Sequence, residues 1–383
     1  MRRCSTIAAL SLPLRLTLLA ALGGCSGDDA GGTQGSSGTE SSSSTSMSAS
    51  GGDTETSGGA TTSGGATTSG GATTSGEPTT SGEPTTGEPT TGGMEAPPPD
   101  APGPCTYAEI KATFKSAKTG NNVPVRALYP TSGPYEAPYP VVTVAHGFQI
   151  PASQYDKYVE RLASFCFVAI NVDFPAGFLA NHVANAQDVA AALDWAAGHA
   201  TLGPIADVDN AGATGHSLGG KVSVLAATFD PRIKASITLD PVDAATFCDP
   251  QLCPDVTDKL PIDIPLGFLG ETLDGMGGFM PCAPADANYQ TFYKKAASPA
   301  LEVTVLGANH VSFVDDVATC GFACGACQMA TADNAAVNAL SRAFVAAFYQ
   351  RYLRGEAAYD AWLTGAEAQA KYVDTKQVTI QSK

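Results

Sequence analysis

Basic residues are scarce in this 383-residue sequence, in which 21 lysines and arginines stand against 37 aspartates and glutamates. The formal net charge is −16. Three of the arginines lie in the first 15 positions, and residues 26–103 contain ten acidic residues and no basic one, so the chain from Pro104 onward carries −9. Proteins that bind nucleic acid need lysines and arginines clustered on one surface to neutralise phosphates. The composition therefore argues against nucleic acid as a partner.

The start of the sequence lacks an uninterrupted apolar run long enough to span a membrane. A positively charged opening is followed by residues 7–22, which are apolar apart from small polar residues and one arginine. This pattern is typical of a secretory signal. It ends in Leu22-Gly-Gly-Cys25, which resembles a bacterial lipobox, and the resemblance implies acylation of Cys25. We predict a lipoprotein signal peptide over residues 1–24 and a lipid-anchored, exported protein. The outer membrane is favoured because Ser26 is not an acidic retention signal.

Residues 25–103 contain too few apolar side chains to form a core. They are rich in Gly, Ser, Thr and Pro and include a repeat of the Ala-Thr-Thr-Ser-Gly-Gly type. Such segments cannot bury enough apolar surface to offset their chain entropy, so we predict a disordered tether. Residues 104–383 contain no second linker and are expected to form one catalytic domain.

Within residues 104–383, apolar strand patterns alternate with helical patterns. This alternation predicts an α/β fold with a mostly parallel central sheet and helices on both faces, in which ligands bind at the carboxyl ends of the strands. The expected strands are 107–116, 123–129, 140–145, 166–172, 210–214, 233–239, 264–269 and 301–306. The expected helices are 155–165, 183–198, 221–228 and 331–353.

One Gly-x-Ser-x-Gly pattern occurs in the chain, at Gly215-His-Ser217-Leu-Gly219. It lies between a predicted strand and a predicted helix, which is the setting of a nucleophile elbow. Flanking glycines let the strand and the helix approach each other while the serine hydroxyl is held above the sheet. The pattern predicts Ser217 as a nucleophile.

Histidines are also few, and a serine nucleophile needs a base. Of the five histidines, only His310 follows Ser217, and the elbow fold places nucleophile, acid and histidine in that order. His310 is therefore the expected base. The residues alone do not decide which carboxylate is the acid of the triad, because Asp240 follows one predicted strand while Glu271 and Asp274 follow the next.

Two backbone N–H groups are expected to bind the oxyanion. One belongs to Leu218, the residue after the nucleophile. The other comes from the loop after strand 140–145, with the sequence His146-Gly-Phe-Gln149. We assign the Phe148 N–H, with Gln149 as the alternative.

An ordered series of motifs in the chain resembles the chlorophyllase branch of the α/β-hydrolases. The motifs are His146-Gly-Phe148, Tyr155, Gly215-His-Ser-Leu-Gly-Gly-Lys221, Leu239-Asp-Pro-Val242, Pro281-Cys-Ala-Pro284, His310 with Asp315-Asp316, and a cysteine-containing loop before the last helix. The resemblance covers roughly residues 105–354. Platelet-activating-factor acetylhydrolases and bacterial polyester hydrolases are similar but more distant.

The resemblance implies that Asp240 is the acid, whereas the polyester-hydrolase arrangement would place it near Asp274. Pro241 should also stiffen the chain and restrict Asp240 to extended conformations. One residue departs from the chlorophyllase pattern: these enzymes characteristically have arginine after the nucleophile, and this chain has Leu218. The departure leaves ester hydrolysis intact and puts chlorophyll as a substrate in doubt.

Eight cysteines follow the predicted tether, and an even number in an exported domain indicates disulfides. We expect a Cys248–Cys253 bridge and a bridge from Cys282 to the cluster of Cys320, Cys324 and Cys327. Cys166, in a predicted buried strand, is expected to stay a free thiol. The cluster has the spacing of an iron–sulfur radical enzyme, but export and the absence of a barrel pattern argue against that chemistry. A zinc site would need a fourth ligand, so we expect no metal and no cofactor.

These expectations describe a serine esterase. Ser217, His310 and Asp240 would hydrolyse a small, lipid or polymeric carboxylic ester through an acyl-enzyme, and the protein would be a monomer. The alternative is a catalytically silent hydrolase-like domain used for binding or adhesion at the cell surface.

Overall fold

The computed structural model describes residues 96–177, 181–244, 248–275 and 281–383. The predicted signal peptide, the lipid attachment at Cys25 and the tether up to residue 95 lie outside the described residues. The last residues of the predicted tether are described and contact the domain: Arg161 donates a hydrogen bond to the Pro99 carbonyl, and Tyr359 donates one to the Pro97 carbonyl.

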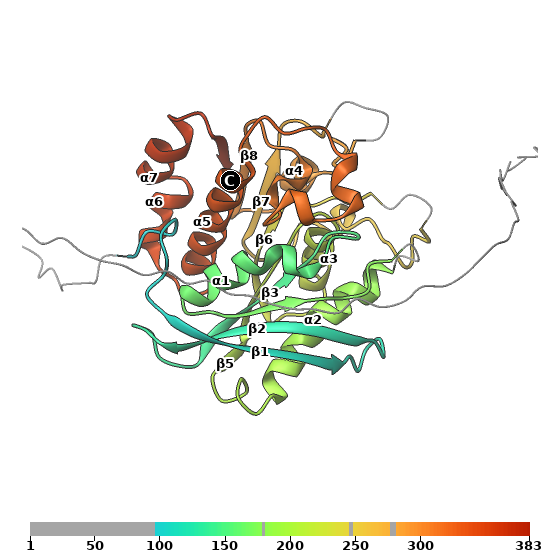
Figure 1. Ribbon diagram of the computed structural model, residues 1–383, viewed down its shortest axis with the longest axis vertical. Helices are drawn as coiled ribbons and strands as arrows, with labels where there is room; N and C mark the ends of the chain where they lie inside the picture. Colours follow the sequence, from blue (N-terminus) through green and yellow to red (C-terminus); the bar gives the residue numbers. More distant parts are fainter. Residues whose placement is uncertain (1–95, 178–180, 245–247, 276–280) are drawn as a thin grey trace, which may run out of the picture. The chain divides into compact units, whose positions relative to one another are not determined.

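A single nine-stranded sheet forms the centre of the domain, with the order β1-β2-β4-β3-β5-β6-β7-β8-β9. The six strands β3 to β8 are parallel, and β1, β2 and β9 are antiparallel to their neighbours. The strands are β1 Thr106–Lys115, β2 Asn122–Ser132, β3 Tyr139–Ala145, β4 Val168–Val172, β5 Ala206–Gly215, β6 Ile233–Leu239, β7 Leu266–Glu271, β8 Ala300–Val305 and β9 Val378–Ser382. The prediction of a mostly parallel sheet is confirmed (Figure 1).

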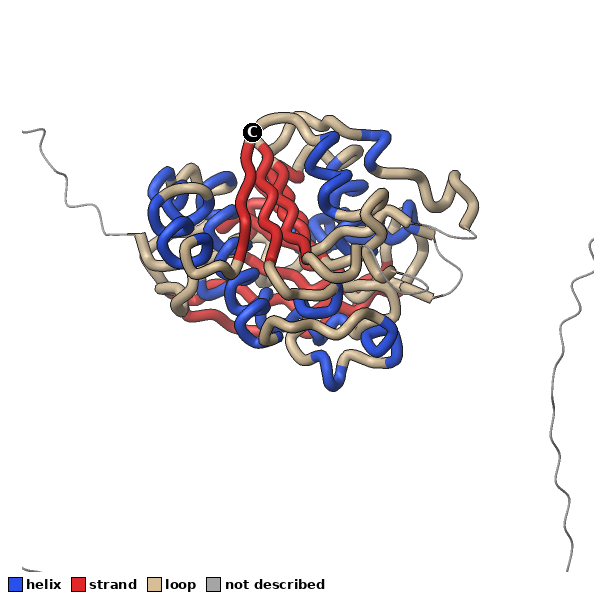
Figure 2. The backbone as a smooth tube through the Cα atoms, turned by 90° about the horizontal axis from the view of Figure 1, so that it is seen from above, coloured by secondary structure: helices blue, strands red, loops and turns tan. Residues whose placement is uncertain are grey.

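Helices cover both faces of this sheet, as expected (Figure 2). The α-helices are α1 Asp156–Ser164, α2 His182–Gly198, α3 Leu218–Ala227, α4 Tyr289–Lys295, α5 Asn334–Tyr352, α6 Asp360–Leu363 and α7 Ala366–Ala368. Short 3-10 helices are η1 Ala152–Tyr155, η2 Thr257–Lys259, η3 His310–Phe313, η4 Val317–Thr319, η5 Phe322–Ala326 and η6 Ala357–Tyr359, and η7 Gln369–Val373 is a π-helix. Helices α1 and α5 share one apolar core with the sheet, while α2, α3 and α4 share another. None of the helices in the described ranges is both long and apolar enough to cross a membrane.

The sequence prediction did not include helices α4, α6 and α7 or strand β9. Helix α4 is only seven residues long, and β9 is an edge strand that pairs with β8 alone. Short elements carry little periodic signal of their own and are stabilised by their neighbours. The strand expected from residue 166 also begins later, at Val168, because Cys166 has a φ of 70° and belongs to the turn after α1.

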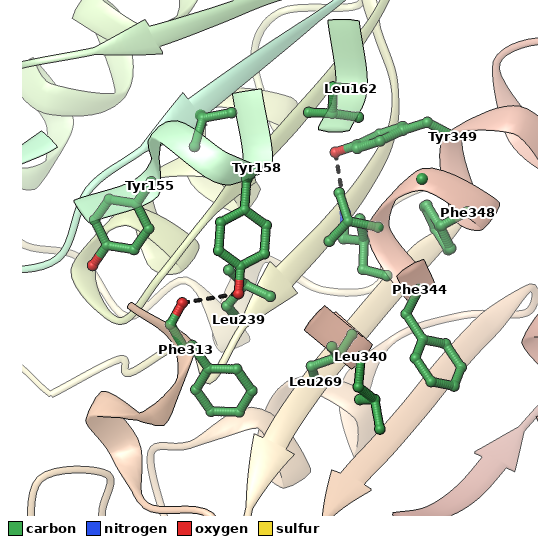
Figure 3. Close-up of a cluster of buried hydrophobic side chains, with 14 of the residues drawn as sticks. Tyr155, Tyr158, Leu162, Leu239, Leu269, Phe313, Leu340, Phe344, Phe348 and Tyr349 are labelled. Carbon is green, nitrogen blue, oxygen red and sulfur yellow. Dashed lines mark hydrogen bonds between the residues drawn. The ribbon is translucent and has the colours of Figure 1, made fainter. Parts of the chain in front are cut away.

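The core beneath α1 and α5 anchors the segment that carries His310. In Figure 3, the Tyr158 hydroxyl reaches the carbonyl of Phe313, the last residue of η3, over 2.8 Å. Asn338 of α5 donates to the same carbonyl. Tyr158 and Phe313 are fully buried, so both bonds form where water does not compete. The position of His310 is thus tied to the rigid part of the fold.

Candidate active site

Ser217 occupies a strained turn between β5 and α3. Its φ of 57° and ψ of −120° are unfavourable for a residue with a side chain. The turn is held because the Ser217 N–H donates to the Leu239 carbonyl of β6 at 3.0 Å. A Cβ atom on Gly215 or Gly219 would overlap backbone atoms of the same turn and of Ala145. The two glycines of the motif are therefore required by the close approach of β3, β5 and α3.

Three side chains from three loops are joined by a continuous chain of hydrogen bonds. Ser217 Oγ lies 2.8 Å from His310 Nε2, and His310 Nδ1 lies 2.6 Å from Asp240 Oδ2. Asp240 has no exposed surface and His310 only 6 %. An imidazole between a hydroxyl and a buried carboxylate can take a proton from one while the other stabilises its charged form. The structure thus brings together the three residues expected from the sequence.

The backbone at Asp240 differs from the expectation. Its φ is +41°, so the extended conformation predicted from Pro241 is wrong. Aspartate tolerates positive φ better than most residues. The Asp240 N–H also donates to the Leu269 carbonyl at 2.6 Å, which fixes the turn after β6. This local conformation depends on the neighbouring strand β7 and could not be inferred from the dipeptide.

Asp274, the alternative acid, lies in the same site but binds the backbone. Its Oδ2 accepts the His310 N–H at 2.7 Å, and its Oδ1 accepts the Gln328 N–H at 2.8 Å. Both oxygens are therefore used in holding the loop that carries His310 rather than in contacting the imidazole. Asp240 is the carboxylate that meets the ring.

Glu271, at the end of β7, adds a third buried carboxyl group near His310. Burial and the charge of Asp240 raise its pKa to about 7. Burial alone would lower the pKa of His310, but the hydrogen bond and charge of Asp240, with the charges of Asp274 and Glu271, outweigh it and raise that pKa. These negative charges stabilise the imidazolium that forms when His310 accepts a proton.

The two expected oxyanion donors lie at the carboxyl ends of β5 and β3. Leu218 is the first residue of α3, where helix N–H groups have no acceptor within the helix. The loop after β3 is tied at Gly147, whose N–H donates to the Tyr155 hydroxyl at 3.2 Å. Phe148 follows with 37 % of its surface exposed, and Gln149 has a φ of 53°. The oxyanion roles of Leu218 and Phe148 stay predictions.

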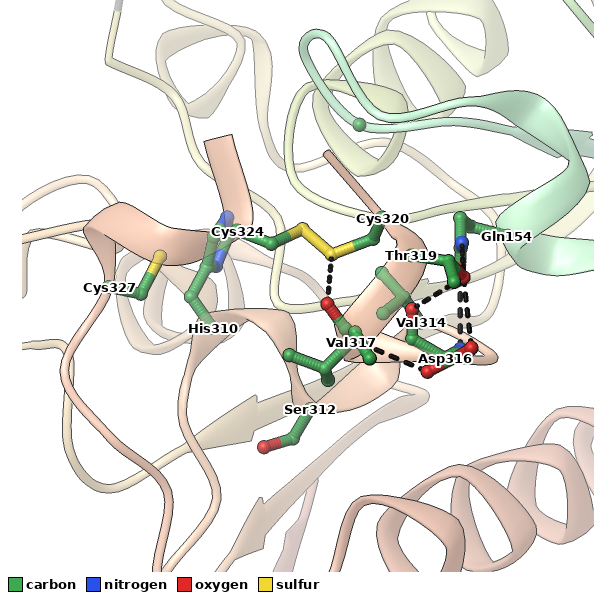
Figure 4. Close-up of a disulfide and its surroundings, with 12 residues drawn as sticks. Gln154, His310, Ser312, Val314, Asp316, Val317, Thr319, Cys320, Cys324 and Cys327 are labelled. Atoms are coloured by element: carbon green, nitrogen blue, oxygen red, sulfur yellow. Dashed lines mark hydrogen bonds between the residues drawn. A yellow bond between two sulfur atoms is a disulfide. The ribbon is translucent and has the colours of Figure 1, made fainter. Parts of the chain in front are cut away.

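The loop after His310 is fastened to η1, which follows the loop after β3. Gln154 of η1 donates to the Thr319 hydroxyl at 3.0 Å and accepts the Asp316 N–H at 2.9 Å (Figure 4). A disulfide joins Cys320 and Cys324 within the same loop. Polar contacts therefore hold this loop against η1, and the disulfide closes a turn within the loop.

The disulfide pattern confirms two expectations and corrects one. Cys248–Cys253 and Cys282–Cys327 are bridged as expected. Cys166 is not a free thiol, because it pairs with Cys105. The reason is its place in the turn before β4, which turns its side chain to the segment preceding β1 rather than into a strand.

One group of side chains in the described ranges has the spacing of metal ligands: Asp274, Cys282 and Cys327. The two sulfur atoms are joined in a disulfide, and Asp274 already accepts two backbone N–H groups. These residues do not fit a metal ion.

Sequence reasoning missed how Asp274 and His216 act on the backbone of His310. His216 is fully buried and its Nε2 lies 2.7 Å from the His310 carbonyl oxygen. The only available signal was its position next to Ser217, which by itself indicates no partner.

Comparison with known proteins agrees with this geometry. The chlorophyllase family model matches residues 102–377. Chlorophyllase-1 of Arabidopsis thaliana is 27% identical over 209 residues, which are 50% of this chain and 64% of that protein. Chlorophyllase-2 of the same plant is 26% identical over 200 residues, 47% of this chain and 62% of that protein. The chain thus covers slightly less than two thirds of the length of these relatives. With the family match spanning most of the domain, the chain belongs to the chlorophyllase family of α/β-hydrolases.

Proposed function

We propose that this chain is a serine esterase that cleaves carboxylic esters with Ser217, His310 and Asp240. The observation that carries the proposal is the row of hydrogen bonds, 2.8 Å and 2.6 Å long, from the Ser217 hydroxyl through His310 to Asp240. Membership of the chlorophyllase family supports ester hydrolysis as the reaction class.

In the acylation step, Ser217 Oγ forms a bond to the ester carbonyl carbon while its proton passes to His310 Nε2. The negative charge on the carbonyl oxygen is bound by the N–H groups of Leu218 and Phe148. The tetrahedral intermediate then loses its alcohol oxygen, which takes the proton from His310. Asp240 keeps the proton of His310 on Nδ1 and stabilises the transient imidazolium.

In the deacylation step, water takes the place of the alcohol. His310 accepts a proton from the water as its oxygen bonds to the acyl carbon, and it returns the proton to Ser217 as the acid leaves. Both half-reactions use the same donors and the same base, so no further cofactor is needed for the proton balance.

One residue, Leu218, narrows the range of esters that we expect this chain to cleave. The Arabidopsis relatives are named chlorophyllases, but this chain has Leu218 after the nucleophile. Leu218, the first residue of α3, carries no charge and is buried in the apolar core, so it cannot bind a charged group of a substrate as arginine could. We therefore expect hydrolysis of simple esters and weak or no cleavage of chlorophyll, which a screen of p-nitrophenyl esters of rising chain length plus chlorophyll would show.

We further propose that the enzyme acts outside the cytoplasm, anchored through a lipid on Cys25 and separated from the membrane by the tether of residues 26–103. The proposal is supported by the signal-like leader and by four disulfides in the described domain, which persist in oxidising compartments.

Ser217→Ala tests the esterase proposal against the alternative of a silent binding domain. Removal of a triad nucleophile lowers kcat by a factor on the order of 10⁶, and the variant should fold normally because serine and alanine differ by one atom. Ser132→Ala, at an exposed serine at the end of β2, is the matched control and should keep full activity. If wild type and both variants are equally inactive on the whole ester panel, the binding-domain alternative holds.

A further inference from the structure

His216 lies between the nucleophile and the fold, with both ring nitrogens engaged. Nδ1 is 2.7 Å from the Tyr155 hydroxyl oxygen, and Nε2 is 2.7 Å from the carbonyl oxygen of His310. The ring has no exposed surface, and its centre is 4.7 Å from the His310 ring. The residue therefore touches the backbone, but not the reacting nitrogen, of the catalytic base.

The end groups of this hydrogen-bonded series fix the direction of its two outer hydrogen bonds. The Gly147 N–H can only donate, and it donates to the Tyr155 oxygen at 3.2 Å. The His310 carbonyl can only accept, so His216 must carry its hydrogen on Nε2. In the neutral ring Nδ1 has no hydrogen, so Tyr155 donates its hydroxyl hydrogen to it. The neutral Nε2–H tautomer of His216 satisfies all three contacts and also gives the Tyr155 hydroxyl hydrogen an acceptor, which a charged His216 would not do.

Charges nearby favour the same form. Burial lowers the pKa of His216 well below its usual value, and the charge of His310 lowers it further. Burial also raises the pKa of Tyr155 well above its usual value, so the hydroxyl keeps its hydrogen. Tyr155 and His310 are the titratable groups whose side chains or backbone contact His216. The apolar ring of Phe313 also lies near it, with 6.1 Å between the two ring centres.

We propose that His216, held as the neutral Nε2–H tautomer, is a positioning residue that couples the loop after β3, at Gly147, to the catalytic base His310. The inference rests on the proposed esterase function and deepens it. Asp274 binds the N–H of His310 while His216 binds its C=O, so the peptide groups of the base are held on both sides. At the other end, Tyr155 accepts the Gly147 N–H and so holds the loop whose Phe148 N–H is the predicted oxyanion donor.

The arrangement helps the transition state in two ways. It keeps His310 Nε2 aimed at Ser217 without using either nitrogen of the His310 ring. It also keeps the neighbouring ring neutral when His310 becomes an imidazolium, since a second cation less than 5 Å away would oppose that charge. Both effects act on the reacting state, so the loss of either should lower kcat more than it raises KM.

The tautomer can be observed directly by NMR. The full chain is labelled with ¹³C,¹⁵N-histidine, and the five imidazoles are followed from pH 5 to 9, with His216 identified by the loss of its signals in His216→Gln. The expected result is a ring that stays neutral with its hydrogen on Nε2 throughout. Titration of His216 near pH 6.5, or a hydrogen on Nδ1, would overturn the proposal.

The coupling is tested by a double-mutant cycle with Tyr155→Phe and His216→Leu. Each should lower kcat by about tenfold or more, as expected when buried hydrogen-bonding groups lose their partners. The double variant should be no slower than the worse single one, because the row acts as a unit. His216→Gln, which retains a donor and an acceptor, should recover most of the activity lost in His216→Leu. Additive losses, or no recovery by glutamine, would contradict the proposal.

Two controls separate positioning from folding and from the function itself. All rates are expressed per active site titrated with a fluorophosphonate, so unfolded protein does not count. Tyr349→Phe removes an equally buried hydroxyl on α5 that accepts the Ile237 N–H and touches none of Ser217, His310 and Asp240, so kcat per site should stay unchanged. Ser217→Ala decides the proposed function separately: if it is inactive while the cycle is additive, only the role of His216 fails.

Discussion

Replacing Asp240 by asparagine should disable the enzyme while leaving its shape nearly unchanged. Asp240 Oδ2 lies 2.6 Å from His310 Nδ1 in a site with no exposure of the carboxylate. Asparagine keeps the volume of the side chain, but its NH₂ group, when turned toward His310, donates to Nδ1. The imidazole hydrogen then lies on Nε2, and His310 cannot take a proton from Ser217 with that nitrogen. A triad imidazole in the wrong tautomer loses about 10⁴ in kcat, or about 5.5 kcal/mol of transition-state stabilisation.

Asp274→Asn is the matched control, since it is the same chemical change in a neighbouring buried carboxylate. Asp274 accepts the N–H groups of His310 and Gln328, and asparagine can accept only one of them. One buried N–H is then left unpaired, which costs about 1–3 kcal/mol of folding stability. The effect on kcat should stay within about tenfold, because the imidazole keeps its own partner.

The two variants are compared with wild type by hydrolysis of a short-chain p-nitrophenyl ester, after thermal unfolding has shown that each is folded. The expected order of kcat is wild type, then Asp274→Asn, then Asp240→Asn far below. If Asp274→Asn is the inactive variant and Asp240→Asn turns over normally, the acid is wrongly assigned and the polyester-hydrolase arrangement is correct.

Three further predictions concern charge, covalent links and the anchor. Because Asp240 and its neighbours raise the pKa of His310, the acid limb of kcat/KM should lie above pH 6.5, and Glu271→Gln should move it to lower pH by removing one of those charges. A wild-type limb below 6.5 would contradict the charge argument. Replacing Cys105 and Cys166 by serine should cost about 4 kcal/mol in denaturant unfolding, since the bridge spans 61 residues; an unchanged midpoint would contradict it. Full-length protein should partition into detergent and Cys25→Ser should not, whereas wild type found in the aqueous phase with an unacylated N-terminus would remove the anchor.

Much of the fold could be predicted because its signals are local. Strand β3 is a nearly continuous apolar run, which marks a buried parallel strand. Strand β6 alternates apolar and polar residues, and it begins and ends at the predicted residues. The edge strand β9 could not be found this way. Its five residues gain their structure from backbone pairing with β8, and its pattern is too short to stand out.

The residues of the candidate site could be chosen from chain order and motif, but their contacts could not. His310 was singled out because no other histidine follows Ser217. The positive φ of Asp240 and the Cys105–Cys166 bridge depend on how the turns after β6 and α1 meet distant strands. The role of His216 depends on Tyr155, 61 residues earlier, and on a carbonyl 94 residues later. Contacts of that range are set by the folded sheet rather than by local sequence.

The nucleophilic role of Ser217 is tested most directly by mass spectrometry of the protein after reaction with a fluorophosphonate. We predict one adduct per chain, located on the peptide that contains Ser217, absent in Ser217→Ala and formed far more slowly in His310→Ala. An adduct on another residue, or none on a preparation that hydrolyses esters, would contradict the assignment of Ser217 as the nucleophile.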